Sequence, residues 1–263
     1  MAKHLQAAFA GRSQVHVVDL GCGTGSNLRA TSALLPSQQN WTLVDYDPRL
    51  LAAAREALGR WADHSVASGD RLIMHKGAHR LDVGFLRFDL NQDLDTALGG
   101  GTDETRDLVT ASAFFDLCSP AFMERFAHAV ARRRTRFYTV LTYNGEQSWT
   151  PSHPGDAEMT AAFHHHQRGD KGFGVAAGPD SARALAGAFR AVGYRVQEGE
   201  SPWILGVGGH ATGDQSLVEE LAHGFAAAVE ETGLVAPSES AAWRTIRRTG
   251  ARVGHTDTFA QPA

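Results

Sequence analysis

The chain has 263 residues, which is enough to bury the core of one α/β domain of ordinary size. Hydrophobic residues make up 43% of it and charged residues 21%, as in globular proteins, and no apolar run approaches the ~20 residues that cross a bilayer. The net charge of −4, without a long basic block, argues against a dedicated DNA- or RNA-binding protein.

The first segment, residues 1–14, is polar and lacks the apolar stretch of a signal peptide, so we expect a cytoplasmic protein. The two cysteines, Cys22 and Cys118, suggest no disulfide framework.

Short apolar runs then alternate with helical patterns, which is typical of a parallel α/β sheet. Strands are predicted over residues 15–20, 41–45, 83–89, 107–111 and 136–142, and helices over residues 27–35, 48–61 and 122–134. The helix at 48–61 has a clear start, because Asp47 is a natural N-cap and Pro48 suits the first helical position.

The alternation breaks at residues 143–179, an insert of about 37 residues rich in His, Gly, Pro and Asp. Beyond it we expect a helix over 181–192, a sixth strand over 194–205, helices over 216–231 and 238–248, and a last strand over 252–260. We expect this last strand to be antiparallel and to lie at the edge of the sheet.

A glycine-rich turn follows the first predicted strand and precedes a helix. Gly21, Gly23 and Gly25 let the backbone bend sharply and leave room for a ligand. Asp45 ends the second strand 20 residues after Gly25, where a carboxylate suits the two hydroxyls of a ribose. These features predict a nucleoside site at the carboxyl edge of a parallel sheet. A glycine turn alone also occurs in NAD and FAD proteins, so an NAD-dependent oxidoreductase stays an alternative.

From about residue 15 to residue 141 the chain resembles the class I SAM-dependent methyltransferases, where SAM is S-adenosylmethionine. VVDLGCGTGSN is similar to the first motif of that family and LVDYDPRLL to the second. The resemblance implies a three-layer Rossmann-like α/β sandwich with a mostly parallel seven-stranded sheet, within one domain over residues 1–263. It also implies SAM as methyl donor and S-adenosylhomocysteine as product.

The resemblance further implies which residues contact SAM. Asp19 and the glycine loop would surround the methionine part, Asp45 would hold the ribose hydroxyls, and Tyr46 would lie against the adenine. Asp89 would meet the adenine amino group, beside the Leu90 backbone. The full implied cofactor site is Asp19, Gly21, Cys22, Gly23, Gly25, Asn27, Asp45, Tyr46, Asp89, Leu90, Ala111 and Ser112.

The acceptor pocket should lie above the ends of the fourth and fifth strands. A lid over it is expected from the insert at about 143–179 and the C-terminal helical segment at about 216–250, since only about 14 residues precede the first strand. A missing N-terminal segment is the competing explanation. The candidate catalytic residues are Tyr143, His153, His165, His166 and Asp116.

The histidines of the insert have three interpretations: substrate contact or proton transfer, structural hydrogen bonding, and metal binding. Successive side chains of a His-His-His run point about 100° apart on a helix, so we expect no metal site. Asp116 could equally cap the following helix or pair with an arginine.

The fourth strand is followed by Ser-Ala-Phe-Phe-Asp, without the signature of enzymes that methylate nucleic-acid amines. We therefore expect a small-molecule acceptor, with an oxygen, nitrogen or carbon nucleophile, and neither nucleic acid nor membrane as partner. A homodimer is kept as an alternative to a monomer. The alternative functions are aminopropyl transfer, which would bring Asp116 and Asp156 together, modification of SAM itself, and a SAM-binding regulatory protein.

Overall fold

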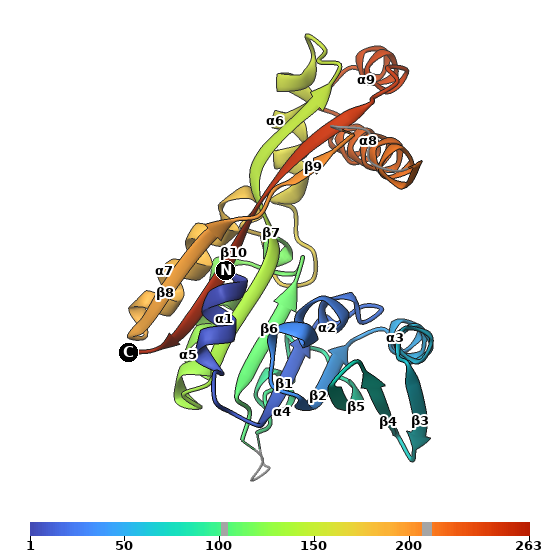
Figure 1. Ribbon diagram of the computed structural model, residues 1–263. Coiled ribbons are helices and arrows are strands. Elements are labelled where there is room, and N and C mark those ends of the chain that lie inside the picture. Colours follow the sequence, from blue (N-terminus) through green and yellow to red (C-terminus); the bar gives the residue numbers. More distant parts are fainter. Residues whose placement is uncertain (101–104, 207–211) are drawn as a thin grey trace.

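A computed structural model describes residues 1–100, 105–206 and 212–263. It shows one mixed sheet with helices on both faces (Figure 1). The strand order is β3-β4-β5-β2-β1-β6-β7-β10-β8, and β9 pairs with β10 outside this path, so the sheet has ten strands. The predicted three-layer α/β fold is confirmed, whereas the predicted number of seven strands is wrong. A hairpin and a divided strand account for the difference.

Five adjacent parallel strands form the centre of the sheet. They are β5 (His79–Arg87), β2 (Gln38–Asp45), β1 (Gln14–Leu20), β6 (Leu108–Ser112) and β7 (Arg136–Thr150). Alternate side chains of β1 enter two different hydrophobic clusters, with Val15 and Val17 in one and Val18 and Leu20 in the other. Because both faces of these strands are covered, the sequence shows continuous apolar runs here.

Helices cover the two faces of the sheet. On one face lie α1 (Ala2–Ala8), α2 (Ser26–Thr31), the short 3-10 helix η1 (Ser32–Leu34) and α3 (Pro48–Trp61). On the other lie α4 (Leu94–Ala97), α5 (Pro120–Arg132), α7 (Ser181–Ala191) and the 3-10 helices η2 (Phe115–Leu117) and η3 (Gly178–Asp180). The predicted cap is present, because the Asp47 carboxylate accepts the Arg49 N–H at 2.8 Å.

A hairpin that the sequence did not reveal extends the sheet beyond β5. It consists of β3 (His64–Ser68) and β4 (Arg71–Lys76), both antiparallel to their neighbours. All five residues of β3 are exposed, and in β4 only Leu72 and Met74 are buried. Because this edge hairpin contributes only two side chains to the core, its sequence has almost no apolar periodicity from which a strand could be predicted.

The other edge of the sheet differs from the prediction in strand order. The last strand, β10 (Gly250–Pro262), is antiparallel as expected, but it lies between β7 and β8 (Tyr194–Glu200) and not at the edge. The predicted sixth strand is divided at Ser201-Pro202 into β8 and β9 (Trp203–Leu205), and both pair with β10. Which neighbour a strand takes depends on long-range pairing that a local pattern does not contain.

Beyond the sheet, β7 and β10 continue together as a two-stranded ribbon that leaves the body of the molecule (Figure 1). The ribbon, together with β9, α6 (Asp156–Gln167), α8 (Thr212–Thr232) and α9 (Pro237–Arg244), is called the arm below. The arm has a hydrophobic cluster of its own, centred on Trp149, Phe225 and Trp243. The insert at 143–179 therefore begins as a strand, continues as a helix, and only then becomes a loop. Among the described residues, no helix has the length and apolarity to span a bilayer.

Candidate active site

The glycine loop connects β1 to α2 at the carboxyl edge of the sheet. Its glycines adopt positive φ angles, +60° at Gly21, +53° at Gly23 and +78° at Gly25, and Gly25 caps the start of α2. This left-handed backbone region favours glycine. A Cβ atom on Gly23 would have nothing within 4 Å, so the loop presents open space beside this residue.

Asp45, the last residue of β2, holds this loop in place. Its carboxylate accepts the N–H of Gly23 at 2.9 Å and the N–H of Asp47 at 3.1 Å. A carboxylate has about four acceptor positions, so Asp45 can still accept hydrogen bonds from a ligand.

Asp19, one residue before the end of β1, is fully buried under the loop. The Asn27 amide donates to its Oδ1 at 2.7 Å, while Oδ2 has no hydrogen-bond partner among the described residues. Burial raises the pKa of Asp19 from its ordinary 3.8 to about 7, and the nearby Asp45 charge adds to the rise. Asp19 therefore supports the loop indirectly, through its hydrogen bond with Asn27.

A cavity of about 490 Å³ opens between the loop and the ends of the neighbouring strands; we call it the cofactor cavity. Of the residues predicted to bind the cofactor, six line it: Gly21, Gly23, Asp45, Tyr46, Asp89 and Leu90. The other six, Asp19, Cys22, Gly25, Asn27, Ala111 and Ser112, do not line it. Cys22, Asn27 and Ala111 are buried, and burial raises the pKa of the Cys22 thiol.

Part of the insert also lines the cofactor cavity, which the sequence did not predict. Residues 170–175 form a tight turn closed by a bridge between Asp170 and Val175, and Lys171, Gly172 and Phe173 face the cavity. The Asn91 amide donates to the Gly172 carbonyl at 2.8 Å. The Phe173 ring packs edge-on against Phe114, with ring centroids 5.4 Å apart. We call this segment the 170–175 turn.

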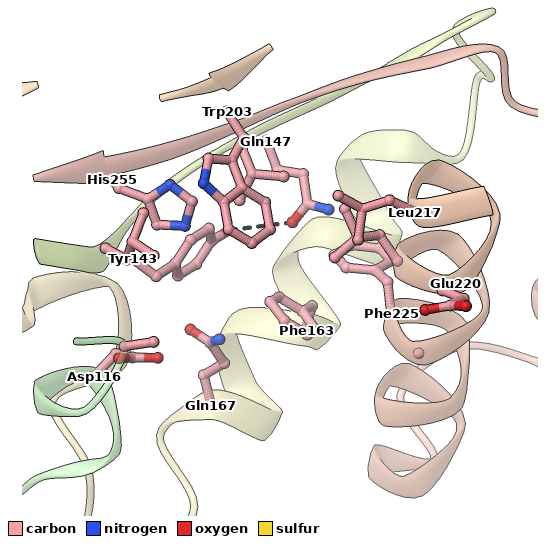
Figure 2. Close-up of a pocket in the computed structure, with 15 residues that line it drawn as sticks. Asp116, Tyr143, Gln147, Phe163, Gln167, Trp203, Leu217, Glu220, Phe225 and His255 are labelled. Atoms are coloured by element: carbon pink, nitrogen blue, oxygen red, sulfur yellow. Dashed lines mark hydrogen bonds between the residues drawn. The ribbon is translucent and has the colours of Figure 1, made fainter. Parts of the chain in front are cut away.

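A second cavity, of about 400 Å³, lies between the sheet and the arm (Figure 2); we call it the acceptor pocket. Its apolar wall comes from Phe163 on α6, Trp203 on β9, Leu217, Leu221 and Phe225 on α8, and Val253 on β10. Asp116 and Tyr143, predicted as catalytic candidates, both line it. Ala113 lines both cavities, so the acceptor pocket and the cofactor cavity meet at this residue.

The backbone is strained where the two cavities meet. Ala113, just after β6, has φ +50°, and Leu141 in β7 has φ +56°, values that side-chain-bearing residues rarely adopt. The Ala113 N–H donates to the Val140 carbonyl at 3.1 Å, and the Leu141 N–H donates to the Asp257 carboxylate at 3.3 Å. Strain that is held by surrounding bonds in this way is concentrated at functional sites.

Three polar side chains in the acceptor pocket have buried atoms without a hydrogen-bond partner among the described residues: Asp116 Oδ1, Gln167 Oε1 and His255 Nδ1. His255 is only 7% exposed and lies 5.2 Å from the Trp203 ring, centroid to centroid. Burial raises the pKa of Asp116 and lowers that of His255. Such atoms are costly in a folded protein and mark positions where a ligand can supply the missing partners.

Residues 17–98 match the family model described as a methyltransferase domain. This segment contains the glycine loop, Asp45 and Asp89, which are features of the cofactor cavity. The matched segment makes up 82 of the 263 residues, and it is similar to methyltransferase domains. The match supports the sequence-based assignment to the class I SAM-dependent methyltransferases, with SAM as the methyl donor that this family implies.

Two solved structures with TM-scores above 0.5 have the same fold as this chain. The YcgJ protein from Bacillus subtilis is 14% identical with a TM-score of 0.53, covering 100% of this chain and 98% of the other. A cyclopropane-fatty-acyl-phospholipid synthase-like protein from Lactobacillus casei is 14% identical with a TM-score of 0.54, covering 98% and 89%. A SAM-dependent methyltransferase from Geobacter sulfurreducens, in complex with S-adenosyl-L-homocysteine, is 15% identical with a TM-score of 0.46, covering 100% and 90%. No curated protein matches the sequence.

Three predicted catalytic histidines, His153, His165 and His166, do not line the acceptor pocket. His153 accepts the Gly155 N–H at 3.1 Å, His165 is exposed on α6, and His166 pairs with Glu231 at 3.0 Å. His164, which was not among the candidates, instead hydrogen-bonds the Tyr143 hydroxyl at 3.1 Å. Consecutive residues on a helix face different directions, which separates the members of the triplet. No group of His, Cys, Asp and Glu in the described chain is arranged to hold a metal ion.

The residues of the cofactor cavity fit SAM. The volume is in the range of small-molecule sites, and the absent side chain of Gly23 leaves open space beside the loop. Asp45 offers free acceptor positions to ribose hydroxyls, while Phe88, Leu90 and Phe114 provide apolar surface for the adenine. Tyr46 is 63% exposed and has the Arg87 guanidinium 5.4 Å from its ring centre.

Proposed function

We propose that this chain transfers the methyl group of SAM to a small molecule held in the acceptor pocket. The observation that carries this proposal is the meeting of the two cavities at Ala113. A donor bound against the glycine loop and an acceptor bound against the arm would be in contact there.

SAM, when bound, supplies an activated methyl group on a sulfonium. The protein's part is to align the acceptor, exclude water and receive a proton if the nucleophile carries one. The aromatic and aliphatic wall of the acceptor pocket excludes water. Asp116 and His255 are the titratable groups there with unpartnered buried atoms, so we assign proton acceptance to them and not to His153, His165 or His166. Tyr143 would position the acceptor through its hydroxyl.

The 170–175 turn has a role in this function as part of the cofactor site. Its contacts with Asn91 and Phe114 keep it against the cofactor cavity, where it would cover bound SAM. The histidine-rich insert therefore contributes to both sites, through Phe163 and Gln167 in the acceptor pocket and through Phe173 in the cofactor cavity.

Aminopropyl transfer receives no support from the geometry. Convergence of Asp116 and Asp156 on one pocket would have supported that reaction, but the Asp156 carboxylate instead accepts the Trp243 indole N–H at 2.7 Å and pairs with Arg248. A SAM-binding regulatory protein would bind SAM and methylate nothing. Turnover of an acceptor therefore separates these functions from the proposal.

Calorimetry with S-adenosylhomocysteine tests the cofactor half of the proposal. Gly23→Val should abolish binding, because the new side chain enters the space that we assign to the ligand. The matched control is Gly77→Val in the β4–β5 turn, where φ is +55° and a Cβ also meets nothing within 4 Å. Both variants carry the same backbone strain, so equal loss of binding in both, or retained binding in Gly23→Val, would contradict the proposal.

The transfer half is tested by release of S-adenosylhomocysteine from SAM in the presence of small-molecule acceptors. Turnover of at least one acceptor, abolished by filling the pocket with Gly224→Trp, supports the proposal, because Gly224 lines only the acceptor pocket of the two cavities. Tight SAM binding without turnover across a broad acceptor panel would favour the regulatory alternative.

A further inference from the structure

We propose that the acceptor is an organic amine, with an apolar or aromatic body and an ammonium group that Asp116 binds. The inference rests on the proposed function, because it names the acceptor of the same site. The charge of the pocket, its aromatic rings and its unpartnered atoms each support this ligand.

The acceptor pocket contains more acidic than basic side chains among its described lining residues. Its described lining residues include two carboxylates, Asp116 and Glu220, and neither a lysine nor an arginine. Buried charges in proteins need a partner of opposite sign, and among the described lining side chains no lysine or arginine offers one to Asp116, while burial lowers the pKa of His255 and so favours its neutral form. A ligand with a carboxylate or phosphate would be repelled here, whereas an ammonium would provide the missing counter-charge.

Aromatic side chains line the same pocket from several elements. The Phe163 ring lies 4.5 Å from Phe225 and 5.9 Å from Tyr143, measured between centroids, and Trp203 approaches from β9. In Figure 2, Trp203 lies across this space from Asp116 and Gln167, and Phe163 lies beside Gln167 on α6. Aromatic faces attract cations and pack well against apolar ring systems, so they suit both parts of such an amine.

The unpartnered atoms select a ligand that donates hydrogen bonds. Asp116 Oδ1 and Gln167 Oε1 are acceptors, and neither has a donor among the described residues. His255 Nδ1 is also without a partner, and the His255 side chain is more than nine-tenths buried. An ammonium carries up to three N–H donors on one atom, while an alcohol carries one and a carboxylate none.

The groups in the pocket account for the protons and electron pairs that methyl transfer to such an amine moves. The ammonium gives one proton to the Asp116 carboxylate and regains its lone pair. The amine nitrogen then forms the new bond to the methyl carbon as the bond between that carbon and sulfur breaks, and the electron pair stays on the sulfur. The product leaves as an N-methylammonium, and Asp116 returns its proton to water.

The test measures binding, by calorimetry, of matched probes that differ in one functional group. Tryptamine, tryptophol and indole-3-acetate share a ring and differ as amine, alcohol and acid, and phenethylamine, 2-phenylethanol and phenylacetate repeat the series with a smaller ring. Each is titrated into the protein with and without S-adenosylhomocysteine. We expect one amine to bind at least about tenfold more tightly than its alcohol, and the acids to bind more weakly than either.

Two variants test whether Asp116 causes the preference for the amine over the alcohol. Asp116→Asn keeps the shape of the side chain and should reduce the amine-to-alcohol ratio to within about threefold, with alcohol binding unchanged. Glu219→Gln removes a carboxylate from α8 that does not line the pocket and should leave the ratio as in the wild type.

Three results would overturn the inference: an alcohol or acid that binds as tightly as its amine, an unchanged ratio in Asp116→Asn, or no binding of any probe. The binding of S-adenosylhomocysteine itself is a separate readout. If it binds and a neutral acceptor is methylated, the amine inference fails and the proposed function stands. If it does not bind, the proposed function fails, whatever the probes show.

Discussion

Asp19 and Asp45 lie at or next to the ends of neighbouring strands, and their surroundings give the two carboxylates different properties. Asp45 borders the cofactor cavity and accepts two backbone N–H groups. Asp19 is fully buried, with one oxygen unpartnered among the described residues. The sequence predicted both as cofactor contacts, but only Asp45 lines the cavity. At the scale of single residues, a carboxylate that lines the cavity can contact the ligand, whereas one that is buried away from it supports the loop.

Asp45→Ala should lower the affinity for S-adenosylhomocysteine by about ten- to a hundredfold. The loss of a charge-assisted hydrogen bond costs ~1–3 kcal/mol, and the Gly23 N–H also loses its acceptor. Calorimetry measures the change. Asp63→Ala is the control, because Asp63 pairs with Lys76 at the far hairpin and does not line the cavity. Unchanged affinity in Asp45→Ala would contradict the assigned ribose site.

Asp19→Asn should change how stability depends on pH. The raised pKa means that the folded protein holds a proton between pH 3.8 and about 7 that the unfolded chain has released. Asp19 therefore makes the free energy of unfolding fall as pH rises through this window, by at most ~4 kcal/mol at 1.36 kcal/mol per pKa unit. Asparagine keeps an oxygen for Asn27 and does not titrate.

The measurement for Asp19→Asn is urea unfolding without ligand between pH 4 and pH 8. The free energy of unfolding of the variant minus that of the wild type should increase with pH up to about 7 and then level off. A difference that stays constant over this range would show that Asp19 ionises normally in the folded protein.

At the scale of elements, the insert at 143–179 consists of three structures in succession. Residues up to Thr150 extend the strand, α6 supplies Phe163 and Gln167 to the acceptor pocket, and the 170–175 turn reaches the cofactor cavity. The sequence showed that this segment was chemically rich but did not show which part faces which site. Its helix has almost no amphipathic pattern, because α6 packs between α8 on one side and the pocket on another.

Phe173→Ala should weaken the binding of S-adenosylhomocysteine by about three- to tenfold. The ring packs on Phe114 and Phe122, with centroids 5.4 and 4.7 Å away, and its removal frees the 170–175 turn from the cavity. Phe163→Ala is the matched control, because Phe163 lines only the acceptor pocket of the two cavities. We expect that variant to keep its affinity for the cofactor product and to lose acceptor turnover. The reverse pattern in calorimetry and turnover assays would contradict this division.

At the scale of the whole molecule, the arm has its own core and the sheet has two others. Trp243 is 1% exposed, packs at 5.4 Å from both Trp149 and Phe225, and has the Arg248 guanidinium 4.4 Å above its ring. The arm supplies one wall of the acceptor pocket, while the cofactor cavity is lined from the sheet and the 170–175 turn. Elements with separate cores can open separately.

Trp243→Ala should destabilise the arm by about 3–5 kcal/mol, the usual cost of removing a buried tryptophan. We expect acceptor turnover to be lost, hydrogen exchange to rise in α8 and α9, and affinity for S-adenosylhomocysteine to change less than about threefold. Trp41→Ala, which removes a fully buried tryptophan from the sheet core, should instead weaken both functions. Equal loss of cofactor binding in both variants would show that arm and sheet unfold as one unit.

The sequence by itself determined the features that are local. The glycines of the loop, Asp45 at the end of β2, and Asp47-Pro48 at the start of α3 each lie within a short stretch whose backbone demands particular residues. Apolar runs likewise revealed the parallel strands, because their side chains are buried on both faces.

Only the tertiary structure decided what depends on distant segments meeting. It placed β10 between β7 and β8, and it formed the acceptor pocket from Ala113, Gln167, Trp203, Phe225 and His255, which lie far apart in the chain. The exposed β3 hairpin and the hydrogen bond between His164 and Tyr143 also became visible only there. Periodicity reports which face of an element is buried, but the partner that buries it is selected by packing over the whole molecule.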